Sequence, residues 1–446
     1  MRRGRWTRLA VLLAAVIGLI AVALPVSAGS DNEQSNPPAV RFATFNASLN
    51  RNSAGELIDD LSGPNDTQAQ AVAEIIQRTH PDVLLINEFD YDDQGLGGSS
   101  LAGQEFQDNY LSIGQMGANP INYDHRMAFP SNTGIHSSTV DPPGHDFDNN
   151  GVIDPTPGSL PYPGDSMGFG FFPGQFAFIV YSMHPILEDD IRTFQNFLWQ
   201  DMPGALLPFD PNDNDEPWYS PEELAVFRLS SKNHVDVPIQ VGKQVVHFLV
   251  SHPTPPVFDD PPFFPEGVDF NGKRNHDEIR LWADYVGPGK NRGSYIYDDD
   301  GQSGGLKPGS LFVIAGDQNS DPNDGDSVPG SAQLLLDNPR VNDKVTPTSQ
   351  GGVDRSAAQP GNETHTGDPA EDTADFSEPP FGPGNLRADY VLPSKSLQIR
   401  DAGVFWPADD DPLTRLTGTG IFGDPVPSSD HRLVWVDVSH GGFPKA

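Results

Sequence analysis

The chain has 446 residues, of which 36% are hydrophobic, and it contains no cysteine. The lack of cysteine excludes disulfide bonds, thiolate zinc sites, thiol nucleophiles and a lipid-modified cysteine. A formal net charge of −35 provides no long-range attraction for nucleic acid or anionic lipid, whereas the many carboxylates suit divalent cations. The 45 glycines and 44 prolines indicate long loops around one core rather than several domains.

The N-terminus has the pattern of a secretory signal peptide over residues 1–28. Four arginines precede an apolar stretch from Leu9 to about Val26, and small residues end at Ala28. An uncleaved membrane anchor is the alternative, since the stretch approaches the length that spans a bilayer. Residues 29–38 are polar and are expected to be a disordered linker. We therefore predict a secreted monomer, extracellular or periplasmic, with no membrane segment after cleavage.

Residues 39–446 are expected to form one domain. Alternating residues predict a strand over 40–45, and apolar residues at helical spacing predict a helix over 67–79 with Asp66 as its N-cap. Further strands are predicted at 83–86, 175–181, 238–241, 244–251, 311–315, 388–392, 397–404 and 433–438, and a second helix at 274–286.

Two stretches, 91–170 and 345–385, have no strong periodicity and are predicted to be long inserts in this domain. Elsewhere strands alternate with a few helices, but there is no regular strand-helix repeat. That pattern favours mixed sheets sandwiched between helices over a doubly wound parallel sheet.

Polar residues that could bind a metal or take part in catalysis lie at the ends of several predicted apolar strands. Each one alone is typical of a turn former or a cap. Together they supply the oxygen ligands of a metal site and histidines for acid-base chemistry. These residues are Asn46, Glu88, His252, Asp317, Asn319, Asp389, Asp430 and His431.

The ordered motifs around these residues resemble the endonuclease/exonuclease/phosphatase superfamily. The motifs are Thr44-Phe45-Asn46, Ile86-Asn87-Glu88, Ser251-His252, Gly316-Asp317-Gln318-Asn319-Ser320-Asp321-Pro322, Arg387-Ala388-Asp389-Tyr390 and Ser429-Asp430-His431. The superfamily includes DNase I-like nucleases, inositol-polyphosphate phosphatases and bacterial sphingomyelinases. The resemblance covers residues 40 to 438, and the run at 271–280 looks similar to a secreted bacterial branch. It implies a DNase I-like, four-layer α/β sandwich of two facing mixed β-sheets flanked by helices.

The resemblance also implies a divalent cation at the active site, Mg²⁺ or Mn²⁺. Glu88 would bind the cation, helped by Asn46 and Asp430. Such a cation acts as a Lewis acid and neutralises the charge on the phosphate during attack.

The other matched residues would carry the reaction itself. Asp317 and Asn319 would orient the attacking water and the phosphate. His431, held by Asp389, would be the base or a cation that stabilises the phosphate, since a carboxylate behind an imidazole fixes its tautomer and raises its pKa. His252 would bind the phosphate or assist the leaving group.

One family element is altered, and other basic residues could replace it. An arginine of the family's inner strand corresponds to Met183 here, which puts a phosphate contact from that strand in doubt. A helix N-terminus near Asn275, as a cap, could hold an anion. An exposed basic strand edge explains the 228–234 segment equally well. The candidate phosphate-binding residues are Arg228, Lys232, His234, Arg274 and Asn275.

Residues 146–154 follow the first nine positions of an EF-hand-type calcium loop. The closing glutamate is missing, because Pro157 stands in its place, and no helix is expected on either side. We interpret the run as a calcium loop whose last ligand comes from elsewhere, for example Asp165; a polar Asn-Gly turn is the alternative. The candidate ligands are Asp146, Asp148, Asn150, Val152 and Asp154.

Taken as a whole, the sequence predicts a secreted, divalent-metal-dependent hydrolase of phosphate esters. A phosphodiesterase or nuclease acting on extracellular nucleic acid is the leading hypothesis. A phosphomonoesterase and a sphingomyelinase-like phospholipase are alternatives within the same chemistry. A calcium-stabilised binding protein without catalytic activity is the alternative from another class.

Overall fold

Six strands form the first sheet, in the order β12-β13-β1-β2-β4-β3. Their bounds are β1 Val40–Leu49, β2 Val83–Phe89, β3 His125–Phe129, β4 Phe178–Ser182, β12 Gln398–Val404 and β13 Val434–Ser439. β1 and β2 are parallel, and the remaining neighbours are antiparallel. The carboxyl ends of β1 and β2 therefore meet the amino end of β13 at one edge of the sheet.

Five strands form the second sheet, in the order β11-β8-β7-β6-β5. Their bounds are β5 Arg192–Thr193, β6 His234–Val241, β7 Gln244–Ser251, β8 Leu311–Asp317 and β11 Asp389–Pro393, and a separate small sheet pairs β9 Ala374–Asp375 with β10 Asn385–Leu386. Here β7 and β8 are the parallel pair, and β11 is antiparallel to β8. This sheet thus repeats the arrangement of the first, with two parallel carboxyl ends beside one antiparallel amino end.

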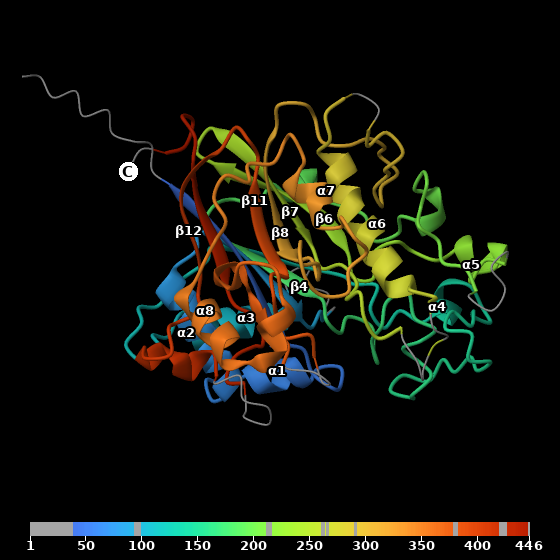
Figure 1. The fold of residues 1–446 in the computed structure, drawn as a ribbon, viewed down its shortest axis with the longest axis horizontal. Helices are drawn as coiled ribbons and strands as arrows, with labels where there is room; N and C mark the ends of the chain where they lie inside the picture. Colours follow the sequence, from blue (N-terminus) through green and yellow to red (C-terminus); the bar gives the residue numbers. More distant parts are fainter. Residues whose placement is uncertain are drawn as a thin grey trace, which may run out of the picture. The chain divides into compact units, whose positions relative to one another are not determined.

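Helices cover the outer faces of both sheets. Their bounds are α1 Glu56–Leu61, α2 Thr67–Thr79, α3 Leu101–Phe106, α4 Ser137–Val140, α5 Pro221–Leu224, α6 Phe270–Tyr285, α7 Gln333–Leu336 and α8 Gln350–Ala358, with a π-helix at Gln107–Leu111. Figure 1 shows α6 and α7 beside β6–β8, and α2 and α3 on the other side of the strands.

Three apolar cores separate these layers. Between the sheets, side chains from both inner faces meet, as in the contact of the Phe42 and Phe248 rings at 5.5 Å. Outside the first sheet, α1–α3 pack on residues such as Phe45. Outside the second sheet, Trp282 of α6 and Leu335 of α7 pack against the strands. This is the four-layer α/β sandwich that the resemblance implied.

The structure describes residues 39–92, 100–210, 216–259, 264, 267–289, 292–377, 382–418 and 426–444. The predicted signal peptide, 1–28, and the linker, 29–38, lie outside these residues. No helix within the described ranges is long and apolar enough to cross a membrane.

Several predicted elements are confirmed. α2 occupies the predicted range, and the Asp66 side chain caps it by accepting a hydrogen bond of 2.7 Å from Ala69 N. β7 also has its predicted bounds. The prediction of a helix capped by Asn275 is wrong, because α6 begins at Phe270 and Asn275 lies inside the helix. The two inserts contain short elements that weak periodicity concealed, including β3 in the first and α8 in the second.

Candidate active site

Both sheets bring the predicted polar residues to the same edge of the sandwich. Asn46 lies in β1 and Glu88 in β2, near the carboxyl ends of the parallel pair. Asp317 ends β8, and Asp389 begins β11 directly opposite it. The alternation of strand directions explains the grouping, since ends of the appropriate sense come together from strands far apart in sequence.

A single amide links the two sheets at this edge. The Nδ2 of Asn46 donates to Glu88 Oε1 at 3.0 Å and to Asp317 Oδ2 at 3.0 Å. Behind it, Asn87 accepts from Asp317 N and donates to Ser251 O, both at 3.3 Å. The sequence analysis assigned no role to Asn87. Its signal was an amide inside an otherwise apolar strand, a position that requires buried partners.

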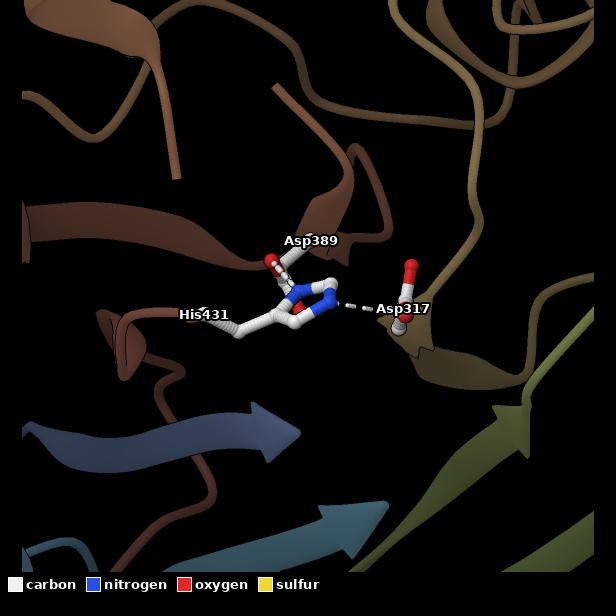
Figure 2. Close-up of side chains that lie close together, drawn as sticks. All are labelled: Asp317, Asp389 and His431. Atoms are coloured by element: carbon white, nitrogen blue, oxygen red, sulfur yellow. Dashed lines mark hydrogen bonds and ion pairs between the residues drawn. The ribbon is translucent and has the colours of Figure 1, made fainter. Parts of the chain in front are cut away.

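His431 lies between two carboxylates that belong to the second sheet, as Figure 2 shows. Its Nδ1 is 2.9 Å from Asp389 Oδ2, and its Nε2 is 3.5 Å from Asp317 Oδ2. Burial opposes a charged imidazole, but the Asp389 and Asp317 carboxylates outweigh it and raise the pKa of His431 well above its ordinary value. The geometry therefore favours the imidazolium form of His431, one of its two predicted roles.

Asp317 has the complementary environment. Burial and the Asp389 charge raise the pKa of Asp317 to about 7, although the His431 charge opposes them. Its Oδ1 accepts from Asn319 N at 2.8 Å, and Asn319 stands in the left-handed region with a φ of 50°. This turn fixes the carboxylate so that Oδ2 faces the site.

His252 completes the group and is held in the neutral state. Its Nε2 is 3.4 Å from Asp317 Oδ2. Burial, followed by the Lys232 and His431 charges, lowers the pKa of His252 well below its ordinary value. Its Nδ1 has no hydrogen-bond partner among the described residues. A neutral imidazole can donate or accept a hydrogen bond to a ligand without adding charge to the site.

Glu88 has the surroundings of a ligand for a divalent cation. Its two oxygens accept from the side-chain amides of Asn46 and Asn50, at 3.0 and 2.8 Å. Burial raises the pKa of Glu88, the Asn46 amide opposes that effect, and the nearby Asp430 charge adds to it. A half-buried carboxylate with a second one beside it gains from a cation, and both offer the oxygen donors that Mg²⁺ binds. The residues thus fit the metal that the resemblance implies.

A second group of side chains that could hold a metal ion consists of His431 and its two carboxylate partners. Ligand atoms of Asp317, Asp389 and His431 lie within 4.8 Å of one another. Both ring nitrogens of His431, however, already face carboxylates. Among the described residues, this group and the carboxylates of Glu88 and Asp430 are the two places at this edge that could hold a cation.

The second insert builds the support of Asp389. The Thr373 hydroxyl donates to Asp389 Oδ2 at 2.8 Å and accepts from Asp389 N at 2.9 Å. Arg432 N donates to Thr373 O at 2.7 Å, and the Phe376 ring meets the His431 ring edge-on at 5.1 Å. Sequence reasoning missed Thr373, because its role exists only through contacts across the fold.

Lys232 is the predicted phosphate-binding residue that lies near the site. It is buried, and burial lowers its pKa, opposed by the charges of Glu278, Glu88 and Asp317. Glu278 of α6 also holds the neighbouring loops, accepting from Ser231 N and Thr254 N at 2.6 Å each. Glu278 was missed, although an acid on the apolar face of a predicted helix signals a buried partner.

The other predicted phosphate ligands have internal partners. Arg228 donates to Asn132 Oδ1 at 2.6 Å, and Arg274 donates to Leu229 O at 2.8 Å. His234 is buried between Ser230 Oγ and Glu278 O, and burial lowers its pKa to about 3.

Asn275 donates to Thr254 O and Gln318 O at 2.8 and 2.9 Å, which braces the two loops after β7 and β8. We therefore withdraw Arg228, His234, Arg274 and Asn275 as phosphate ligands.

The chain is similar to several known proteins. In a search of solved structures, an endonuclease/exonuclease/phosphatase from Beutenbergia cavernae DSM 12333 is 16% identical, with a TM-score of 0.46 over 92% of this chain and 73% of the other. Sphingomyelinase C from Streptomyces griseocarneus is 11% identical, with a TM-score of 0.40 over 90% of this chain and 100% of the other. The human Nocturnin catalytic domain is 11% identical, with a TM-score of 0.39 over 90% and 93%.

The comparison with curated proteins gave no match. The sequence model of the Endonuclease/Exonuclease/phosphatase family matches residues 43–431, a range that contains both sheets' site residues from Asn46 to His431. The chain therefore belongs to the Endonuclease/Exonuclease/phosphatase family.

Proposed function

We propose that this protein is a secreted, divalent-metal-dependent hydrolase of phosphate esters that acts on phosphodiesters. The observation that carries the proposal is the position of His431, held between Asp389 and Asp317 beside Glu88. A paired imidazole, a carboxylate oxygen that faces the site and a cation ligand at one edge are the groups that water attack on phosphorus needs.

His431 supplies positive charge to the phosphate. Because carboxylates face both ring nitrogens, the imidazole holds its second proton, and Nε2–H can donate to a phosphate oxygen that enters the site. Charge that develops on that oxygen in the transition state is then stabilised by a donor already in place.

Asp317 takes the proton from the attacking water. Its Oδ2 faces the site, while Asn319 N holds Oδ1. His252 is neutral and lies 3.4 Å from the same oxygen, so its Nε2–H can donate a hydrogen bond to the leaving oxygen, which takes its proton from solvent. Glu88, with Asn46 and Asp430, would hold the Mg²⁺ or Mn²⁺ ion, which when bound supplies Lewis-acid neutralisation of the phosphate.

The charge of the site favours a diester over a monoester. Among the described residues discussed at this edge, Lys232, His431 and Arg432 are the cationic side chains. The carboxylates there are Glu88, Asp317, Asp389 and Asp430. A diester phosphate carries one negative charge, whereas a monoester carries nearly two at neutral pH, so the diester meets less repulsion.

Secretion rests on residues 1–28 alone, with their arginines, apolar stretch and small residues before Gly29. N-terminal sequencing of the protein recovered outside the cytoplasm tests it. A chain that begins at Gly29 supports secretion, and an intact Met1 in a membrane fraction contradicts it.

The hydrolase proposal is tested with three substrates side by side: plasmid DNA, bis-p-nitrophenyl phosphate and p-nitrophenyl phosphate. Each is incubated with the purified protein and Mg²⁺, Ca²⁺ or EDTA. We expect Mg²⁺-dependent cleavage of the two diesters, abolished by EDTA and by His431→Ala. His247→Ala is the matched control, since His247 is also paired with an aspartate, at 2.8 Å from Asp236 Oδ1, but lies outside the site.

Two outcomes contradict the proposal in different ways. Faster turnover of the monoester than of either diester would replace the substrate class and leave the hydrolase chemistry standing. If none of the three is cleaved, and sphingomyelin and inositol phosphates also remain intact, the chain is a binding protein that retains the fold.

A further inference from the structure

The acidic run at 146–151 folds into a tight loop whose backbone amides point at carboxylates. Asp146 accepts from Asn150 N and Gly151 N, at 3.0 and 2.8 Å. Asp148 Oδ1 accepts from Asn150 N at 3.1 Å, and Asn150 Nδ2 donates to Asp148 Oδ2 at 2.8 Å. These contacts draw the side chains of three alternate positions to one side of the loop, as in cation-binding loops.

Asp165 joins this loop from a distant part of the first insert. One ligand oxygen each of Asp146, Asp148 and Asp165 lies within 4.8 Å of the others. Asp165 is fully buried, at 0% exposure, and its Oδ1 accepts from Phe147 N at 2.9 Å. Its Oδ2 is also buried and has no hydrogen-bond partner among the described residues. A polar Asn-Gly turn, the alternative interpretation, does not require a buried carboxylate oxygen without a hydrogen-bond donor.

The charges around Asp165 make this burial costly without a cation. Asp165 shares the cluster with the Asp146 and Asp148 carboxylates, and one ligand oxygen of each lies within 4.8 Å of the others. Burying a carboxylate among like charges is unfavourable unless a cation or several donors compensate. The unpartnered oxygen points to a missing positive partner at this position.

We propose that Asp146, Asp148 and Asp165, together named the acidic loop site, bind one calcium ion. Ca²⁺ accepts six to eight oxygens in flexible geometry, which suits carboxylates delivered by one loop and one distant residue. Asn150 and the Val152 carbonyl are the further ligands predicted from the sequence. The active site does not enter this proposal, so the two can fail separately.

The predicted ligand Asp154 is corrected by the structure. Its Oδ1 accepts a hydrogen bond from Thr156 N at 3.0 Å, and Asp154 is not part of the acidic loop site. Asp165, and not Asp154, joins Asp146 and Asp148 in one group, so Asp165 would supply the closing ligand. Asp154 thus offers a control of the same charge in the same loop.

The position of the site indicates what the ion stabilises. The Phe147 ring packs on the Phe227 ring at 4.6 Å, and Trp218 Nε1 donates to Phe147 O at 3.1 Å. Two residues beyond Asp165, the Met167 carbonyl accepts from Arg274 of α6. An ion here would therefore fasten the first insert to the layer outside the second sheet.

Calcium binding is tested by titrating CaCl₂ into EDTA-stripped protein that carries Glu88→Gln, which removes the active-site ligand. We expect one Ca²⁺ per chain with a Kd between about 1 µM and 1 mM. Saturating Ca²⁺ should raise the Tm by about 3 °C. Asp148→Asn should weaken binding by at least about 10-fold, whereas Asp154→Asn should leave it unchanged. Equal affinity in the two variants would overturn the proposal.

A second readout uses the folded parent protein, in case Asp148→Asn does not fold. Terbium replaces calcium in sites made of oxygen ligands. Trp218 forms hydrogen bonds with Phe147 and Asn149 of the loop and is therefore placed to sensitise terbium emission. We expect sensitised Tb³⁺ emission that Ca²⁺ displaces and that Trp218→Phe reduces several-fold. Emission that is absent, or that neither change affects, would contradict the site.

Discussion

At the scale of single residues, the site depends on one histidine whose charge is set by two carboxylates. Asp389 holds Nδ1 at 2.9 Å, and Asp317 faces Nε2 at 3.5 Å. Asp389 is itself fixed by Thr373, so a residue of the second insert controls the orientation of the pair. Sequence order revealed the pair, because each member stands in a recognisable motif. It did not reveal Thr373, which lies in no recognisable motif and contacts Asp389 only in the folded structure.

The first prediction concerns this charge. Asp389→Asn keeps the shape of the side chain but removes the carboxylate that stabilises the imidazolium. We expect kcat for bis-p-nitrophenyl phosphate to fall by about 10²- to 10⁴-fold with little change in KM. Steady-state kinetics measure the effect, and Asp401→Asn on the exposed part of β12 is the charge-matched control. A change of less than twofold in Asp389→Asn would exclude the proposed role of the pair.

At the scale of elements, the site is formed by close pairing of parallel strands. Gly316 precedes Asp317 in β8 and has a φ of 143°, and a Cβ added there would collide with Ser251 O of β7. Only glycine allows this approach. The register of β7 against β8 therefore sets where His252 and Asp317 lie relative to each other.

The second prediction follows from that contact. Gly316→Ala should push β7 and β8 apart, lower the free energy of unfolding by about 1–3 kcal/mol and reduce kcat/KM at least about 10-fold. Gly309→Ala is the control, because Gly309 also has a positive φ, 90°, but its added Cβ would meet open space. Thermal unfolding and kinetics should separate the two variants. Full activity in Gly316→Ala would show that strand spacing does not position the site.

Helices and strands could be predicted from the sequence where the apolar spacing and the capping residues agree. α2 was predicted in full, because its apolar spacing and its Asp66 cap agree. The start of α6 was misplaced, because Asp269 at its N-cap position makes no capping hydrogen bond and stands in the left-handed region. Asn275, which has the chemistry of a cap, instead serves as a buried brace. β3 was missed because it is an edge strand of five residues inside an irregular insert.

At the scale of the whole molecule, the net charge of −35 leaves carboxylates close together inside the fold. Asp372 is only 8% exposed, and four other carboxylates act on it: Asp321, Asp324, Asp368 and Glu371. Burial first, and these charges next, raise the pKa of Asp372 to about 8. The layers and the mixed sheets were predictable from motif order, whereas such local crowding was not.

The third prediction is a pH dependence of stability. Between the ordinary pKa of an aspartate and about 8, the unfolded chain releases the Asp372 proton and the folded chain keeps it, so stability falls as pH rises. Asp372→Asn should remove this loss and raise the free energy of unfolding at pH 9 by roughly 2–5 kcal/mol, with little effect at pH 4. Denaturant unfolding at both pH values measures the gain. An equal gain from Asp401→Asn would assign the effect to net charge alone.

The most direct test of the account is a double-mutant cycle across the two sheets, measured as Mg²⁺-dependent hydrolysis of bis-p-nitrophenyl phosphate. Glu88→Gln alters the first sheet and Asp317→Asn the second. If both residues serve one site, each change should lower kcat/KM by about 10²-fold or more. The kcat/KM of the double variant should then be only slightly lower than that of the less active single variant. Single variants that keep the parent's activity, or losses that multiply fully, would contradict a shared active site between the sheets.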